Sequence, residues 1–298
     1  MNTKQITKKV TEGIINCLEK GVVPWNSGII NTIGSATKFD GDLYHGVNQW
    51  ILNAEVLLND YKVNRWVTFN RCRKEGGRVI KGQKSTEVVF WKMFETEQTN
   101  KDGKVVEKTI PLLRTFRLFN ICQTTLYKPS KTKKVNKVNK VNNEIAEQLI
   151  GNWNNEVAIK YGFDNTSCPY YSPSKDFINI PFGNGIKWES AELLNKVTFH
   201  EMIHSTGNSK RLNRFGKAEL NGTKADILHN KGDYSAEELV AEFGSQILAD
   251  YCDFKDNHIE NTSSYINSWI KCLKNNTDWI LWASRRAEKA VELIINKK

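Results

Sequence analysis

Apolar residues recur at helical spacing near the start of the chain. In residues 3–20 they recur every three or four positions on one face, with one adjacent pair: Ile6, Val10, Ile14, Ile15 and Leu18. This spacing predicts an amphipathic helix that ends at Gly21. A second helix is expected from Val47 to about Leu58, and a short third helix from Asn70 to Lys74.

Two segments rich in Val, Phe and Leu follow in the same half of the chain. Residues 87–93 and 113–120 have the composition of strands, and residues 100–103 between them form a polar turn. We therefore expect a pair of strands joined by a hairpin. Together with the preceding helices, these strands predict an α+β fold class.

The second half of the chain shows two longer helical patterns. The first starts after Ser190, a good N-cap, and stops near Gly207. The second begins after Ser235, which can cap it with Glu238 as the capping-box partner. Its apolar stripe indicates a buried amphipathic helix: Leu239, Val240, Phe243, Ile247 and Leu248.

The first of these helices carries an HExxH motif, which runs from His200 through Glu201 to His204. Residues four apart share one face of a helix, so both imidazoles can bind one metal ion. Two histidines leave a tetrahedral zinc with room for a third protein ligand and a water molecule. Glu201 lies beside that water and is the expected catalytic base. The alternative is a pair of ordinary helical histidines, and the metallopeptidase arrangement is favoured over it.

The third metal ligand is expected on the downstream helix. We predict Glu238 as the ligand and Glu242, one turn later, as a carboxylate that supports a ligand histidine. The two roles can be exchanged, and a purely capping role for Glu238 is the alternative. Glu237 points about a hundred degrees away around the helix and is a weaker candidate. The predicted cofactor is one Zn²⁺ ion, with another divalent ion such as Mn²⁺ as the alternative.

Length and composition fit two domains. The chain has 298 residues, more than a usual single domain. Residues 128–142 are basic and of low complexity, which predicts a flexible linker. We therefore expect a domain at 1–127, a linker at 128–143 and a second domain at 144–298. The absence of a long apolar run and of a signal-peptide pattern, together with scattered cysteines, predicts a cytoplasmic protein without membrane spans.

Charge is divided unevenly between the two halves. Residues 1–143 hold 25 Lys and Arg against 12 Asp and Glu, whereas residues 144–298 hold 18 against 21. A basic first half favours a polyanionic partner. Cations there are interleaved with aromatic residues, as in proteins that bind single-stranded nucleic acid. The predicted DNA-binding residues are Trp66, Phe69, Arg71, Arg73, Lys74, Arg78, Lys81 and Lys84.

Several motifs in this order resemble the ArdC-type antirestriction family, whose N-terminal domain also resembles part of plasmid TraC-type primases. In the first half the matching segments are 18–25, 44–48, 66–69, 77–84, 88–91 and 119–123. In the second half they are 176–181, 200–207, 211–212 and 237–242. The resemblance covers nearly the whole chain.

The resemblance implies a function. Members of this family are carried by mobile elements, bind single-stranded DNA with the N-terminal domain and protect incoming DNA from host restriction. Their C-terminal domain has a mainly helical zincin-like fold of the gluzincin type. Two hypotheses follow: a DNA-binding shield with a structural metal domain, or an active zinc peptidase that DNA delivers to an unknown protein substrate. A third hypothesis is a primase-associated role, but the sequence shows no set of carboxylates for nucleotidyl transfer. The oligomeric state is left open.

Overall fold

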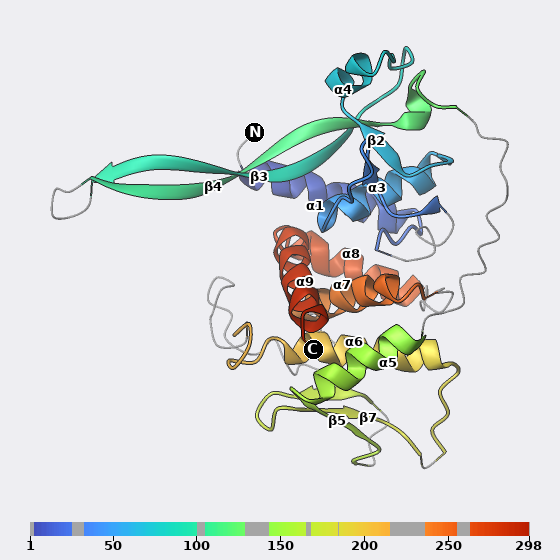
Figure 1. Ribbon diagram of the computed structural model, residues 1–298, viewed down its shortest axis with the longest axis vertical. Coiled ribbons are helices and arrows are strands. Elements are labelled where there is room, and N and C mark those ends of the chain that lie inside the picture. Colours follow the sequence, from blue (N-terminus) through green and yellow to red (C-terminus); the bar gives the residue numbers. More distant parts are fainter. Residues whose placement is uncertain are drawn as a thin grey trace. The chain divides into compact units, whose positions relative to one another are not determined.

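The computed structural model describes residues 3–25, 33–99, 105–128, 143–164, 168–183, 185–214, 236–254 and 263–297 (Figure 1). The chain forms two compact units. Unit 1 comprises Met1–Pro24 and Ile33–Lys133, and unit 2 comprises Trp25–Thr32 and Lys134–Lys298. Residues 129–142 of the predicted linker, and the predicted turn at 100–103, lie outside the described residues.

Unit 1 mixes helices with a four-stranded sheet, as the α+β prediction requires. The helices are α1 (Thr3–Glu19), α3 (Val47–Leu58) and α4 (Phe69–Lys74), followed by a 3₁₀ turn at Ile121–Gln123. The strands are β1 (Thr37–Lys38), β2 (Arg65–Val67), β3 (Thr86–Thr99) and β4 (Val105–Asn120). They lie in the order β1-β2-β4-β3, with β1 parallel to β2 and the other pairs antiparallel. The three predicted helices of this half are confirmed to within about one residue at each end.

The two predicted strands are confirmed as a pair, but they are much longer than the sequence pattern indicated. The pairing of β3 with β4 runs from Thr86 opposite Leu118 to Thr99 opposite Val105, and Figure 1 shows it as a long two-stranded ribbon. Beyond Phe94 the sequence of β3 is polar and charged. A search for hydrophobic strand patterns does not detect polar segments, so it missed this extension.

Helices α1 and α3 cover the sheet of unit 1 and share its core. Ile14, Leu18, Leu52 and Leu118 are almost fully buried there. The indole of Trp66 lies in the same core, 1% exposed. Its burial determines what this residue can contribute to DNA binding.

Unit 2 combines helices with a small three-stranded sheet, against which α5 and α6 pack (Figure 1). The helices are α5 (Asn143–Asn154), α6 (Ala191–Ser205), α7 (Ala236–Tyr251), α8 (Ser263–Asn275) and α9 (Trp279–Ile295). The strands are β5 (Ala158–Tyr161), β6 (Tyr170–Ser172) and β7 (Phe177–Ile180), in the order β5-β7-β6. Helix α7 packs against both α6 and α9. This packing buries four of the five residues of the apolar stripe predicted from the sequence, and Ile247 is half-buried.

Trp25 packs within unit 2, although it lies near the start of the chain. Its ring is 1% exposed and lies 5.1 Å from the ring of Phe243 and 6.3 Å from that of Trp269, edge-on in both cases. Aromatic pairs in this geometry stabilise a core beyond their buried area. Trp25 therefore belongs to the hydrophobic core of unit 2.

Among the described helices, none combines the length and the apolar character that crossing a membrane requires.

Candidate metal centre

Helix α6 forms as its sequence signals predict. The side chain of Ser190 accepts a hydrogen bond of 3.0 Å from the backbone N–H of Leu193, which caps the first turn. The helix ends at Ser205, and the N–H of Gly207 donates to the carbonyl of His204 at 2.8 Å. The HExxH motif therefore occupies the last two turns of a capped helix.

A glycine allows α7 to approach α6 closely. A Cβ atom at Gly244 would lie 2.6 Å from Cδ1 of Ile203, which is closer than real atoms come. Ile203 sits between the two histidines in the sequence, and Glu238 lies about two turns before Gly244 on α7. The close packing thus helps to bring the carboxylate of α7 to the histidines of α6.

The ligating atoms of His200, His204 and Glu238 converge. The two Nε2 atoms are 3.1 Å apart, and the carboxylate oxygens of Glu238 lie 3.3 Å from Nε2 of His200 and 3.5 Å from Nε2 of His204. With metal–ligand distances of about 2.0–2.1 Å, a tetrahedral centre separates neighbouring ligand atoms by roughly 3.4 Å. The donor set therefore fits one divalent cation, with a fourth position left for a small molecule.

Glu201 directly follows His200 on α6, but it is not one of the three candidate metal ligands. Its side chain is buried and accepts a hydrogen bond from the backbone of Tyr171, on strand β6. Burial is the main cause that raises the pKa of Glu201 above its ordinary value. A carboxyl group with a raised pKa is suited to taking and returning a proton near neutral pH.

Glu237 contacts His204 from the side opposite the ligand set, a role that the sequence did not predict. Its Oε1 lies 3.5 Å from Nδ1 of His204, whereas Nε2 of the same ring faces Glu238. Arg214 donates to Glu237 from Nε at 3.0 Å and to the backbone oxygen of Ile203 from Nη2 at 2.8 Å. The Arg214 and Glu237 side chains are 4% and 3% exposed. The helical-wheel argument against Glu237 excluded it as a ligand but overlooked the second nitrogen of the imidazole.

Glu242 is half-buried on α7, one turn beyond Glu238. Among the described residues, the group that can hold a metal contains Glu238 and does not include Glu242. The supporting role of Glu242 towards a ligand histidine stays a prediction. The proposed cap Ser235 lies outside the described residues.

The two histidines lie in a strongly acidic setting. Burial alone lowers the pKa of His204, but the carboxylates of Glu237 and Glu238 outweigh burial and raise that pKa to about 10. Burial also lowers the pKa of His200, but the neighbouring carboxylates, chiefly Glu238, outweigh burial and raise that pKa. Excess negative charge of this kind suits a site for a divalent cation.

A buried ion pair fixes the segment that follows α6. Arg211 donates from Nη1 to Asp176 at 3.3 Å and from Nε to the carbonyl of Ser205 at 2.8 Å. The hydroxyl of Tyr171 donates to Asp176 at 2.7 Å. These bonds tie the end of α6 to strands β6 and β7, and so hold the backbone that contacts Glu201.

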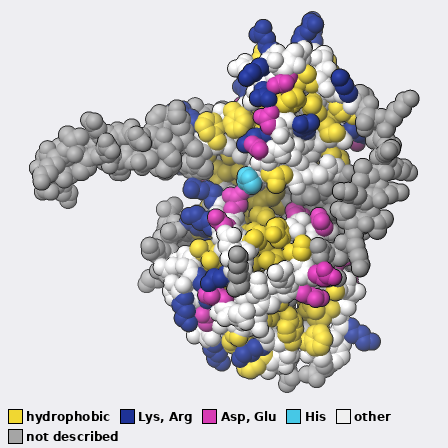
Figure 2. Space-filling view, viewed as in Figure 1, with side chains coloured by type: hydrophobic (Ala, Val, Ile, Leu, Met, Phe, Trp, Pro, Cys, Tyr) yellow, Lys and Arg dark blue, Asp and Glu magenta, His cyan; other side chains and the backbone are white. Residues whose placement is uncertain are grey.

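Most of the predicted DNA-binding cations are exposed on two neighbouring segments of unit 1, which we call the basic surface. It comprises five exposed side chains on α4 and on the loop that leads to β3: Arg73, Lys74, Arg78, Lys81 and Lys84. Figure 2 shows several Lys and Arg side chains gathered over the end of the unit that carries α4. Phe69 lies beside them on α4, 51% exposed. The side chain of Gln123 donates to the carbonyl of Lys84 at 2.8 Å and so holds the loop in place.

One of the predicted DNA contacts requires correction, and a second is less favoured. Trp66 is 1% exposed, and its indole N–H donates to Asn64 at 2.7 Å, so its ring is not available to stack on a base. Of the two aromatic residues predicted to contact DNA, Trp66 and Phe69, only Phe69 has an exposed ring. Arg71 lies 2.7 Å from Asp40 and 2.8 Å from Glu75. Two carboxylates thus offset its charge, which makes Arg71 the weakest of the predicted phosphate contacts.

Two family models match the chain in succession. Residues 4–119 match the N-terminal domain of anti-restriction factor ArdC, and residues 144–286 match a zincin-like metallopeptidase. DNA primase TraC of Escherichia coli is 26% identical over 98% of this chain, and the chain spans only 27% of that primase. The uncharacterized protein y4eC of Sinorhizobium fredii (strain NBRC 101917 / NGR234) is 24% identical, over 96% of this chain and 90% of that protein.

The fold is also shared with a solved structure over nearly the full length. The metal-free crystal structure of antirestriction ArdC protein from the R388 plasmid has a TM-score of 0.70 and 25% identity, over 98% of this chain and 97% of that chain. Its Mn(II)-bound crystal structure gives the same TM-score at 24% identity. By the order of its domains and by its fold, this chain belongs to the ArdC-type antirestriction family, with an ArdC N-terminal domain followed by a zincin-like metallopeptidase domain.

Proposed function

We propose that this protein is an antirestriction factor of a mobile genetic element, which binds single-stranded DNA and protects it as it enters a host cell. One observation carries the proposal: a match to the ArdC N-terminal domain is followed by a match to a metallopeptidase domain, and the fold is shared with the R388 protein over nearly its full length. The role is a cytoplasmic one, since incoming DNA meets restriction enzymes there.

The basic surface of unit 1 supports binding of the strand. Exposed cations can follow a phosphate backbone, and the exposed ring of Phe69 offers a face on which a base can stack. Contacts of this kind carry little sequence information, because every nucleotide has a phosphate and a π-face. The expected partner is therefore single-stranded DNA of almost any sequence.

The metal centre supports a second, separable activity. We propose that His200, His204 and Glu238 hold one Zn²⁺ ion, with Mn²⁺ as the alternative, since the R388 protein has an Mn(II)-bound structure. A cation held there supplies a Lewis acid that polarises water and a peptide carbonyl. Glu201 is placed to take a proton from that water and to pass it to the leaving amine.

A second candidate function is a peptidase that DNA binding delivers to an unknown protein substrate. The observation that favours it is the buried Glu201 beside the convergent ligands, because a purely structural metal site has no need of a proton acceptor. A replication role, suggested by the match to part of TraC primase, would rest on DNA binding alone.

Binding of the full-length protein to DNA at several salt concentrations tests the first part of the proposal. We expect single strands to bind more tightly than duplex, with affinity that falls steeply as salt rises. Replacing Arg73, Lys74 and Lys81 by alanine should lower the slope of log affinity against log salt by about 0.7 per lost contact. Lys62→Ala removes an exposed cation of the same unit, already paired with Asp60, and is the control. Salt-insensitive binding, or a preference for duplex, contradicts the proposal.

A further inference from the structure

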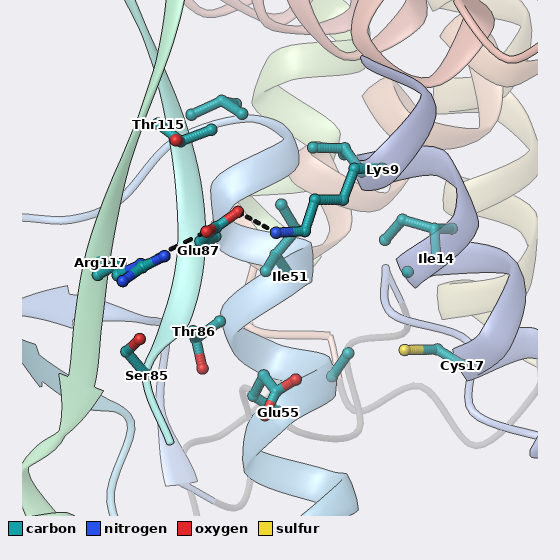
Figure 3. Close-up of a pocket in the computed structure, with 14 residues that line it drawn as sticks. Lys9, Ile14, Cys17, Ile51, Glu55, Ser85, Thr86, Glu87, Thr115 and Arg117 are labelled. Atoms are coloured by element: carbon teal, nitrogen blue, oxygen red, sulfur yellow. Dashed lines mark hydrogen bonds and ion pairs between the residues drawn. The ribbon is translucent and has the colours of Figure 1, made fainter. Parts of the chain in front are cut away.

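Unit 1 contains a cavity of about 350 Å³ between α1, α3 and the paired strands β3 and β4 (Figure 3). This volume is at the lower end of the range for sites that bind small molecules. Much of its wall is aliphatic: Val10, Ile14, Ile51, Ala54 and Val89. Such a wall can enclose a flat ring, and the cavity is separate from the metal centre and from the basic surface.

One end of the cavity carries an excess of positive charge. Lys9 on α1 and Arg117 on β4 reach Glu87 from opposite sides (Figure 3). The ion pair with Lys9 is the main cause that holds the pKa of Glu87 below its ordinary value, so this carboxylate stays ionised. Two cations then share one anion. Their side chains are 52% and 73% exposed, so both remain accessible to a phosphate group.

The other end carries a carboxyl group that is poorly solvated. Glu55 on α3 faces the cavity, and burial is the main cause that raises its pKa. Among the described residues, Asn59 donates a hydrogen bond to it, at 2.9 Å. A carboxylate in such a setting gains most from a ligand with paired N–H donors, since these replace the lost water.

Two residues that line the cavity adjoin the basic surface in the sequence. Ser85 and Thr86, which line it, directly follow Lys84 of the basic surface. A strand whose phosphates follow that surface therefore passes near residues that line the cavity. Among anionic ligands with a flat ring, this proximity favours a nucleotide.

We propose that this cavity binds one guanine nucleotide of the DNA strand, with the base between the aliphatic side chains, its N1–H and N2–H groups on Glu55, and its phosphate near Lys9 and Arg117. Guanine presents two adjacent N–H groups to a carboxylate. Thymine presents one, and adenine and cytosine present only an amino group on the corresponding edge. The inference rests on the single-stranded DNA binding proposed above and adds a preference for one base to contacts that otherwise ignore sequence.

Two substitutions in the full-length protein test the site. Gly13 lines the cavity from α1, and a Cβ atom there would meet nothing within 4 Å, so Gly13→Leu should fill the space without backbone strain. Glu55→Gln removes the paired acceptor while keeping the side-chain size. Gly151 on α5 is equally open, so Gly151→Leu is the matched control.

Calorimetry with deoxyguanosine monophosphate, and anisotropy with oligonucleotides that differ at one guanine, provide the readouts. We expect the nucleotide to bind to wild type and to Gly151→Leu, and to bind about tenfold more weakly to Glu55→Gln and Gly13→Leu. Thymidine monophosphate should bind wild type about tenfold more weakly than the guanine nucleotide. The oligonucleotide with guanine should lose its advantage in both cavity variants.

The possible failures are distinguishable. If wild type binds no single-stranded DNA, the proposed function fails. If wild type binds single strands but does not discriminate guanine from thymine, or if Glu55→Gln leaves that discrimination unchanged, the cavity is not a base site and the proposed function stands. Should Gly13→Leu fail to fold, Glu55→Gln alone decides between these results.

Discussion

The carboxylate of Glu237 lies 3.5 Å from Nδ1 of His204, while Nε2 of the same imidazole faces the ligand set. Through Arg214, this carboxylate is joined to the backbone of Ile203 inside the HExxH motif. A carboxylate in this position fixes the orientation of the ring and increases its basicity as a ligand. A buried chain of contacts from Arg214 through Glu237 to His204 therefore lies behind the candidate metal centre.

Glu237→Gln should weaken metal binding by about 10- to 100-fold without abolishing it, because the ligands remain but one loses its support. Glutamine keeps the side-chain size and can still accept from Arg214, which limits the loss of stability. Titration calorimetry with Zn²⁺ measures the effect, and Glu242→Gln is the comparison. A larger loss in Glu242→Gln would return the supporting role to the residue that the sequence pattern favoured.

Removal of a ligand should have a stronger effect. His204→Ala and Glu238→Ala should each reduce the metal content from about one ion per chain to nearly none, since two ligands hold a divalent ion poorly. Elemental analysis of dialysed protein gives the stoichiometry, with His45→Ala, an exposed histidine of unit 1, as the control. Full occupancy in His204→Ala would exclude the assigned site. Loss of metal in Glu242→Ala but not in Glu238→Ala would exchange the roles of the two glutamates.

The chain offers a contrast between two helical glycines. Gly244→Ala places a methyl group 2.6 Å from Ile203 and should destabilise the protein by about 1–3 kcal/mol through overpacking. Gly151→Ala has open space around it and should stabilise α5 by about 0.5–1 kcal/mol. Urea unfolding measures both. Equal effects of the two substitutions would show that α6 and α7 do not approach as closely as described, and that the position of Glu238 depends on other contacts.

Asp176 should make the stability of the folded protein depend on pH, in a direction that follows from its pKa. Burial raises the pKa of Asp176, but hydrogen bonds from Arg211 and Tyr171 outweigh it, so the pKa lies below the ordinary 3.8. A depressed folded-state pKa contributes stability above the unfolded value, and this contribution is lost as the pH falls through the folded value.

Wild-type stability should therefore fall as the pH drops below about 4. Asp176→Asn should be less stable near neutral pH and should show a smaller fall in acid. Urea midpoints across this range measure the difference, with Asp42→Asn, an exposed residue, as the control. A variant with the wild-type profile would show that the Asp176–Arg211 pair contributes nothing to stability.

The sequence predicted the elements of the fold better than it predicted the contacts between them. Ser190 and Gly207 marked the ends of α6 because capping is local chemistry. The polar part of β3 was missed because its residues lack the hydrophobic pattern of a strand, although its backbone pairs with β4. Trp25 was expected among the residues of the first half, whereas its ring packs on Phe243 of α7, a long-range contact that no local pattern reveals.

In the candidate site, too, the sequence predicted local geometry better than it predicted contacts between elements. The spacing of His200 and His204 was sufficient to predict that their imidazoles meet, since helix geometry is fixed. The helical-wheel argument placed Glu238 towards the ligands, and the structure brings it there. The contact of Glu237 with His204, and the burial of Trp66, depend on how elements pack against each other. Hydrophobicity and charge along the chain carry little information about such packing.

Transfer of a plasmid into a restricting host tests the central claim most directly, which is that protection depends on the basic surface and not on hydrolysis. The assay compares wild type, Glu201→Gln, and a variant with Arg73, Lys74 and Lys81 changed to alanine, each checked for folding and for DNA binding. We predict that Glu201→Gln protects as well as wild type and that the alanine variant loses protection, because a shield needs only occupancy of the strand. Loss of protection in Glu201→Gln with normal DNA binding would contradict the account and assign protection to peptidase activity.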